Sequence, residues 1–371
     1  MAVAAIPAPP FGEHTRAEWL HHRFRELELQ DIEIDEIGNA IAVRPGSSSD
    51  HKSSDVKSKA VAVTAHLDTV FPEGTNVQPS QDRDKLYGPG ISDNAAGITA
   101  LLALASALRH AHIKADADII FIGNVGEEGE GDLRGIRHIF SQEKWRERIG
   151  YTLVLDGTGT DSIVCEALGS RRYEITVRGP GGHSWSDFGI PNPIVVLSRA
   201  IASFSEIQVP SSPKTTFNIG NISGGTSVNS IPESVTIRVD MRSTQKQELS
   251  RIEDAMRKAF ERAVAEASTN GQKVSFEMKQ IGERPAAEVP KDARILEVIR
   301  AVDSHLRISS SRRRASTDAN IPLSLGLEAI SIGAGGQGGG AHTLHEWYDP
   351  TGRDLALKRI LLTVLALSGI Q

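Results

Sequence analysis

The sequence predicts an α/β protein with a mostly parallel sheet flanked by helices, into which a smaller α+β domain is inserted. Nearly continuous apolar runs of strand length recur along the chain, and such runs are typical of strands buried on both faces of a parallel sheet. Helical patterns lie between these runs, which indicates alternating strands and helices. The middle of the chain instead has the order β-α-β-β-α-β, which is that of a split ferredoxin-like unit.

The elements of the α/β domain are assigned from their apolar spacing. Four apolar runs predict buried strands: Lys59–Asp68, Asp118–Gly123, Tyr151–Leu155 and Glu328–Gly333. Three segments with helical spacing predict helices: Arg16–Leu29, Asn94–Leu108 and Thr351–Ser368.

The inserted domain is assigned in the same way. We expect strands at Arg172–Arg178, Thr215–Ile222, Val235–Arg242 and Lys273–Ile281, and helices at Asn192–Ile207 and Gln245–Ser268. The expected domains are therefore 1–170 with 284–371 for the α/β domain, and 171–283 for the insertion. The basic run Arg312–Arg314 lies in a Ser-rich setting and is expected to be an exposed loop.

The composition excludes several classes of protein. The 371 residues carry a formal net charge of −6, whereas nucleic-acid binding needs a basic face. No apolar run reaches the roughly 18 residues of a membrane span, and the N-terminal segment lacks the basic region of a signal peptide. The single cysteine, Cys165, excludes an intramolecular disulfide and fits a reducing compartment. We therefore expect a cytoplasmic protein that binds neither nucleic acid nor a membrane.

Acidic and histidine side chains stand where the predicted buried strands end. His66 and Asp68 end one strand two positions apart, so they point to the same face. Asp156 ends another strand, and the pair Glu127 and Glu128 follows a third. Ligands of open α/β sheets collect at the carboxyl ends of the strands. The coincidence of these clusters at several strand ends predicts a site there.

Two further segments have competing interpretations. Asp93 directly precedes a predicted helix, so it is either a site residue or the helix N-cap, a position that aspartate favours. The glycine-rich segment 333–340 resembles a phosphate loop, but it lacks the GxxxxGK[ST] pattern and a following helix. A backbone that passes close to the site is the favoured interpretation of this segment.

Five motifs follow one another along the chain: His66-Leu-Asp68, Gly-Ile-Ser-Asp93-Asn, Gly-Glu127-Glu128-Gly, Leu-Asp156-Gly and Ala-His342-Thr-Leu-His-Glu346. In this order they resemble the motifs of the co-catalytic zinc exopeptidases, a family that includes peptidase T, glutamate carboxypeptidase, acetylornithine deacetylase, aminoacylase and carnosinase. Gly181-Gly-His183-Ser, Asn229-Ser-Ile-Pro and Asp240-Met-Arg242 resemble motifs of the family's inserted lid domain. The motifs are nearest to those of peptidase T-like aminopeptidases.

The resemblance implies a role for each of these residues. One zinc ion would be held by His66, Asp93 and Asp156, and a second by Asp93, Glu128 and His342. Glu127 would be the general base, and Asp68 would orient His66 without contacting metal. His183, Asn229 and Arg242 of the lid would bind substrate. The resemblance also implies a cis peptide bond between Asp93 and Asn94.

The implied activity is hydrolysis of an amide bond in a small peptide, most simply by an aminopeptidase that acts on di- or tripeptides. A carboxypeptidase or an N-acyl-amino-acid deacylase of the same family is the nearest alternative, and a non-catalytic relative is another. A nucleotide-binding enzyme is supported only by the glycine content and the α/β rhythm. Sites of mixed histidine and carboxylate ligands accept cobalt or manganese as well as zinc. A homodimer through the inserted domain is left open.

Overall fold

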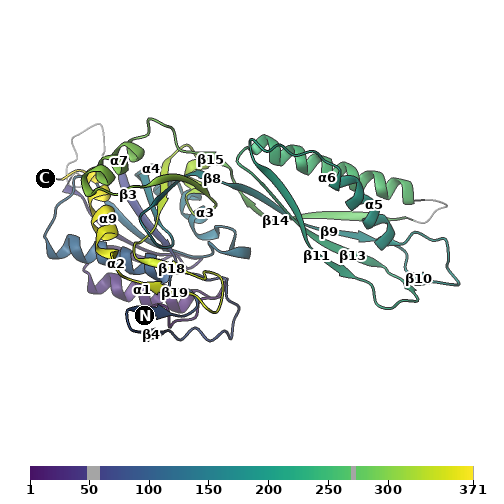
Figure 1. Ribbon diagram of the computed structural model, residues 1–371, viewed down its shortest axis with the longest axis horizontal. Helices are drawn as coiled ribbons and strands as arrows, with labels where there is room; N and C mark the ends of the chain where they lie inside the picture. Colours follow the sequence, from purple (N-terminus) through teal and green to yellow (C-terminus); the bar gives the residue numbers. More distant parts are fainter. Residues whose placement is uncertain (48–58, 269–272, 371) are drawn as a thin grey trace. The chain divides into compact units, whose positions relative to one another are not determined.

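The computed structural model describes residues 1–47, 59–268 and 273–370. The chain divides into two compact units, Met1–Ala167 with Glu288–Gln371, and Leu168–Ala287. In each unit, helices pack against a β-sheet (Figure 1). Among the described residues, no helix is long and apolar enough to cross a membrane.

The central sheet of the first unit confirms the predicted fold class. Its strands lie in the order β1-β2-β6-β3-β7-β17-β8-β15, and β16 pairs with β8. The strands are β1 Gln30–Ile34, β2 Ala40–Arg44, β3 Ala60–His66, β6 Ile119–Asn124, β7 Ile149–Leu155, β8 Ser162–Ala167, β15 Ala287–Glu288, β16 Ser311–Ala315 and β17 Glu328–Ile332. The middle strands β6, β3, β7 and β17 pair in parallel. Every residue of β3 and β6 is buried, as expected for strands covered on both faces.

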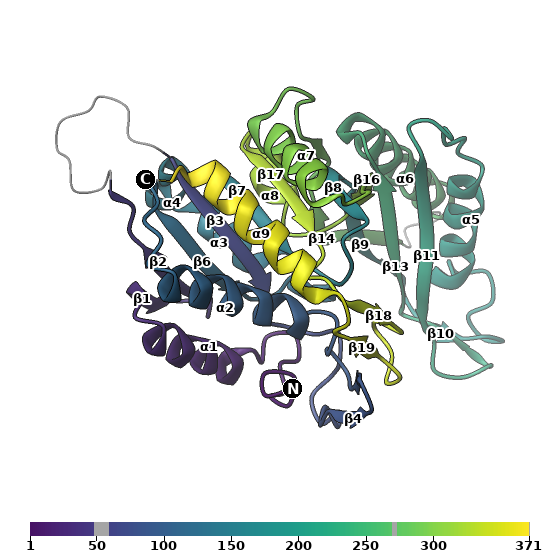
Figure 2. The same ribbon diagram turned by 60° about the vertical axis from the view of Figure 1, so that its left-hand side comes forward.

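Helices cover both faces of this sheet. On one face α2 and α9 contact β3 and each other, and Figure 2 shows α1, α2 and α9 side by side in front of the strands. On the other face the apolar residues of α3, α4 and α8 form one buried cluster with those of β2, β3 and β6. The helices are α1 His14–Glu26, α2 Ala95–His110, α3 Arg134–Ser141, α4 Glu143–Arg148, α7 Arg294–Leu306, α8 Asn320–Ser324 and α9 Arg353–Ser368.

A small sheet of the same unit, β18-β19-β5-β4, is separate from the central sheet. Its strands are β4 Ser80–Asp82, β5 Lys85–Tyr87, β18 Gln337–Gly339 and β19 Trp347–Asp349. The connection from β18 to β19 therefore carries His342 and Glu346. Because β19 pairs with β5, this connection is brought to the segment that follows β5.

The second unit has the predicted ferredoxin-like order. Its sheet runs β11-β13-β9-β14 with antiparallel neighbours, and its helices α5 and α6 pack on one face, where their apolar residues share a buried core with the strands. The elements are β9 Gly169–Arg178, β10 Gly182–His183, α5 Pro193–Ser205, β11 Thr215–Gly224, β12 Ser230–Ile231, β13 Ser234–Ser243, α6 Lys246–Ala267 and β14 Ser275–Arg284.

One prediction about the first unit is wrong. The basic run Arg312–Arg314 is not a loop but part of β16, which pairs in parallel with β8. The strand lies at an edge and its side chains are mostly exposed, so it needs no apolar pattern. Arg314 is paired with Glu166 on β8, and charged side chains of this kind are common on edge strands.

Candidate metal centre

The carboxyl ends of three parallel strands bring the predicted site residues of the first unit together. His66 is the last residue of β3, Asp156 directly follows β7, and Glu127 and Glu128 follow β6 within four residues. Parallel strands end at the same edge of a sheet, which is why side chains far apart in sequence meet there. Asp93 lies just before α2, and His342 comes from the β18–β19 connection.

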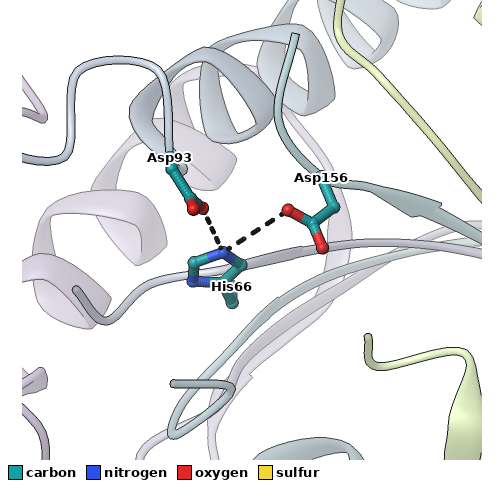
Figure 3. Close-up of side chains that lie close together, drawn as sticks. All are labelled: His66, Asp93 and Asp156. Atoms are coloured by element: carbon teal, nitrogen blue, oxygen red, sulfur yellow. Dashed lines mark hydrogen bonds and ion pairs between the residues drawn. The ribbon is translucent and has the colours of Figure 1, made fainter. Parts of the chain in front are cut away.

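Among the residues that the structure describes, these side chains form three groups of potential metal donors, and two of the groups share Asp93. The first group is His66, Asp93 and Asp156, and the second is Asp93, Glu128 and His342. The group without Asp93 is His66, Glu127 and Glu128. Figure 3 shows His66 between the two aspartates of the first group. Its Nε2 lies 3.0 Å from Asp93 Oδ1 and 3.9 Å from Asp156 Oδ1.

The second group is arranged around the other oxygen of Asp93. His342 Nε2 lies 3.2 Å from Asp93 Oδ2 and 2.9 Å from Glu128 Oε1. One carboxylate thus presents one oxygen to each group. Ligand atoms of a tetrahedral zinc ion lie about 3.3 Å apart, since the bonds to nitrogen and oxygen are 2.0–2.2 Å long. The donor types and spacings fit two ions bridged by Asp93.

The hydrogen bonds of His66 set the tautomer that a metal ligand needs. His66 Nδ1 lies 3.1 Å from the main-chain carbonyl oxygen of Asp68, and a carbonyl only accepts, so Nδ1 donates. This leaves Nε2, on the side of Asp93 and Asp156, as the ring atom that could bind a metal once it has lost its hydrogen. A partner on the second ring nitrogen is the usual support of a metal-binding histidine.

Asp68 contacts more than His66. Its carboxylate lies 3.6 Å from His66 Nδ1 and accepts hydrogen bonds from the main-chain N–H groups of Glu127 at 2.9 Å and Glu128 at 2.7 Å. Asp68 is fully buried. It therefore ties the end of β3 to the segment that carries Glu127 and Glu128.

The crowding of acids perturbs the ionisation of the site. Burial, followed by the charge of Glu127, raises the pKa of Glu128 to about 7. Burial and the charge of Asp93 raise the pKa of Asp156 well above its ordinary value. A hydrogen bond to Asp93 is the largest cause that raises the pKa of His342 to about 9. A bound cation would reduce the electrostatic repulsion among the carboxylates that face one another in this partly buried site.

The N-cap interpretation of Asp93 is wrong. The N-cap of α2 is Asn94, whose side chain accepts a hydrogen bond from Gly97 N at 3.2 Å. Asn94 Nδ2 also donates to the main-chain oxygen of Leu155 at 2.8 Å, directly before Asp156. The Asp93–Asn94 peptide bond is cis, which confirms that expectation.

Two buried carboxylates at the site had no role assigned from the sequence. Asp318, fully buried before α8, accepts a hydrogen bond from Asn124 Nδ2 at 2.7 Å, and burial followed by the charge of Glu127 raises its pKa to about 7. Glu346 is also buried and accepts hydrogen bonds from the segment that ends at Asp93. The Ala-His342-Thr-Leu-His-Glu346 motif is the one sequence signal that included Glu346.

The three predicted lid residues lie in the second unit. His183 and Asn229 are neighbours, because β10 pairs with β12 and Ser184 N donates to the Asn229 main-chain oxygen at 3.0 Å. The Nδ1 atom of His183 accepts from the main-chain N–H groups of Trp185 and Ser186, so the neutral ring carries its hydrogen on Nε2. Arg242, on β13, donates from Nε to Asp240 Oδ2 at 2.7 Å.

Comparison with known proteins identifies the family of the chain. The model of peptidase family M20/M25/M40 matches residues 62–365, which includes all the donor residues. The uncharacterized protein YqjE of Bacillus subtilis (strain 168) is 24% identical over 84% of this chain and 80% of its own. Succinyl-diaminopimelate desuccinylase of Psychrobacter sp. (strain PRwf-1) is 29% identical over 49% of each chain.

Solved structures share the fold over nearly the whole chain. The aminopeptidase PepT of Bacillus cereus ATCC 10987 superposes with a TM-score of 0.78 at 21% identity, covering 100% of this chain and 97% of its own. A tripeptidase of Staphylococcus aureus subsp. aureus Mu50 gives a TM-score of 0.79 at 20% identity, covering 99% and 96%. The family match spans well over half of the sequence, and the chain belongs to peptidase family M20/M25/M40.

Proposed function

We propose that this hydrolase is a two-metal aminopeptidase that cleaves an amide bond in short peptides, with Glu127 as its general base. The observation that carries the proposal is the division of the Asp93 carboxylate between two donor groups, Oδ1 beside His66 and Oδ2 beside His342. Each group supplies three protein ligands, and three ligands leave a position open for water or substrate, as in catalytic rather than structural zinc sites.

The residues around the two proposed metal ions have different roles in the reaction. Metal ions bound in the two groups would polarise the scissile carbonyl and lower the pKa of a water molecule. Glu127, which is buried beside His66 and Glu128, accepts the proton of that water and delivers it to the leaving amine. Asp68 fixes the main chain of Glu127 through the 2.9 Å hydrogen bond to its N–H group.

The preference for a free amino end rests on charge and on the identity of residue 156. A substrate ammonium group is attracted by the carboxylates of the site. In the family that the motifs resemble, aminopeptidases and dipeptidases tend to have aspartate where deacylases and carboxypeptidases have glutamate. Asp156 occupies that position in this chain. Aspartate and glutamate differ by one methylene, which does not by itself determine substrate specificity. The preference for a free amino end therefore has to be tested with matched substrates.

A deacylase or carboxypeptidase is the second candidate. It is favoured by the names of sequence relatives, which include succinyl-diaminopimelate desuccinylases and probable carboxypeptidases at 26–29% identity. The chain spans about half the length of these relatives. Their substrates carry over to this protein only as alternatives.

Matched peptides separate the candidates. The metal-loaded protein is assayed with one tripeptide, its N-acetyl derivative and its C-terminal amide. We expect the free tripeptide to have the highest kcat/KM and N-acetylation to reduce it sharply. Faster cleavage of the N-acetyl peptide favours the deacylase, and strict dependence on a free carboxyl end favours the carboxypeptidase. Two bound metals without turnover of any substrate in a wider peptide screen favour a non-catalytic relative.

Four finer parts of the proposal rest mainly on the sequence. Zinc is proposed as the metal from the family resemblance, and His183, Asn229 and Arg242 are proposed substrate contacts from their lid motifs. A homodimer through the second unit is supported by its exposed apolar side chains, among them Trp185 and Phe188. A cytoplasmic location is supported by the single cysteine.

A further inference from the structure

The carboxylate of Glu346 is an unusual feature of the site, because it is buried and, within the described part of the chain, its hydrogen-bond donors come from one short segment. Its Oε2 accepts from Gly90 N at 2.8 Å. Its Oε1 accepts from Ser92 N at 2.8 Å, Ser92 Oγ at 2.6 Å and Asp93 N at 2.9 Å. The residue is 1% exposed. Four donors on two oxygens use the acceptor capacity of the carboxylate almost completely.

These hydrogen bonds join the two segments that carry Asp93 and His342. Gly88 N donates to the main-chain oxygen of Glu346 at 3.0 Å, so both the main chain and the side chain of Glu346 hold residues 88–93. On its own side, Glu346 N donates to Thr343 O at 3.2 Å, which closes the turn next to His342. Glu346 is thus the residue through which the His342 turn is fixed to the main chain of Asp93.

The two donor groups depend on this connection to different degrees. His66 ends β3 and Asp156 follows β7, and these strands pair with each other, so the central sheet itself sets their spacing. His342 belongs to no strand and its side chain is 53% exposed. Besides the direct contact of His342 Nε2 with Asp93 Oδ2 at 3.2 Å, the hydrogen bonds described between this turn and residues 88–93 run through Glu346.

We propose that Glu346 is a positioning residue that sets the metal affinity of the second donor group, Asp93, Glu128 and His342, more than that of the first. This inference rests on the proposed two-metal function. Glu346 belongs to none of the donor groups found among the described residues, and it acts by holding the Asp93 segment beside the His342 turn through the amides of Gly90, Ser92 and Asp93. Residues that support metal ligands in this way typically change metal affinity about 10–100-fold when they are replaced.

The test is a metal titration of Glu346→Gln with Zn²⁺ or Co²⁺ alone. Glutamine retains one acceptor oxygen but puts an NH₂ group against one of the donors. We expect one metal per chain to bind within about threefold of the wild-type affinity, and the second to bind about 10–100-fold more weakly. With Co²⁺, the visible absorption should lose the increment that the second equivalent adds in the wild type.

Two further variants keep the result interpretable. Ser92→Ala removes one of the four donors and leaves the carboxylate, so it should weaken the second metal by a smaller factor, and its effect should not add to that of Glu346→Gln. Asp303→Asn is the matched control, because Asp303 is a buried carboxylate that pairs with Arg359 between α7 and α9 and touches no donor residue. It should change the melting temperature without changing the difference between the two metal affinities.

The outcomes separate this proposal from the proposed function. Equal weakening of both metals, or no weakening of either, overturns the positioning role of Glu346. Two metals in the wild type with no peptide turnover overturn the aminopeptidase proposal and leave the affinity comparison valid. A wild type that binds fewer than two metals overturns both.

Discussion

The two donor groups that share Asp93 are built in different ways. In the first, His66 is 1% and Asp156 20% exposed, and both stand at the ends of paired central strands. In the second, His342 is 53% exposed and comes from a connection between two short strands. The central sheet therefore preorganises the first group, whereas the second depends on hydrogen bonds between loops.

Two buried carboxylates supply those hydrogen bonds, and both act on main-chain amides. Asp68 accepts from the N–H groups of Glu127 and Glu128, and Glu346 accepts from those of the segment that ends at Asp93. An acceptor that serves several amides restrains a whole loop rather than one side chain, which is what a site assembled from separate loops requires.

The largest effect is expected for a variant that impairs catalysis but leaves both donor groups intact. Glu127→Gln should lower kcat about 10²–10⁴-fold, because it removes the proton acceptor. Metal analysis should still find two ions, since Glu127 is not counted among the ligands. Asp93→Ala is the contrasting variant, and it should lose both metals along with activity. Turnover near that of the wild type in Glu127→Gln would refute the base assignment.

A second pair of variants tests whether the two donor groups differ in metal affinity. His342→Ala leaves the first group, and Asp156→Ala leaves the second. We expect the single metal that remains to bind more tightly in His342→Ala, because the sheet holds His66 and Asp156 in place. Calorimetric titration of both variants under the same conditions measures this difference. Tighter binding in Asp156→Ala would show that the exposed group is the stronger site and would reverse the comparison.

Much of the fold was predictable because its signals are local. The strands β3, β6, β7 and β17 appear as apolar runs, and the acids that follow the first three mark the edge of the sheet where the candidate site lies. The edge strand β16 was not predictable, because its basic residues carry no apolar pattern and its partner β8 lies about 150 residues earlier. Pairing over such a distance is a tertiary property that overrides local propensity.

The roles of buried carboxylates were hidden for a similar reason. Glu346 receives its donors from residues about 250 positions earlier, and Asp318 from Asn124. An isolated acid gives no sign in the sequence that distant amides will bury it. The sequence could suggest the proposed metal ligands because each of them occurs in a short motif.

A smaller effect concerns proton release when metal binds to the second group. Without metal, the pKa of His342 is about 9 because of its hydrogen bond to Asp93, and that of Glu128 is about 7 because of burial. Below these values each group holds a proton that metal must displace. In Asp156→Ala, metal affinity should therefore fall about tenfold from pH 8 to pH 7, and more steeply below pH 7 where Glu128 is also protonated. Calorimetry in buffers of different ionisation enthalpy counts the released protons, and an affinity independent of pH would contradict the assignment of His342.

The smallest effect expected is that of His345→Ala, which sharpens the assignment of His342. Both histidines lie in the connection between β18 and β19, but only His342 is within hydrogen-bonding distance of Asp93 and Glu128 among the described residues. His345 is exposed, and its main-chain N–H donates to Thr343 Oγ1, an interaction that alanine keeps. Replacing an exposed side chain of this kind usually changes stability by less than about 0.5 kcal/mol.

His345→Ala should accordingly bind two metals and retain its turnover, whereas His342→Ala loses one metal. Because the two variants remove the same side chain three positions apart, they control for each other. Loss of a metal in His345→Ala, with two metals retained in His342→Ala, would transfer the ligand role to His345.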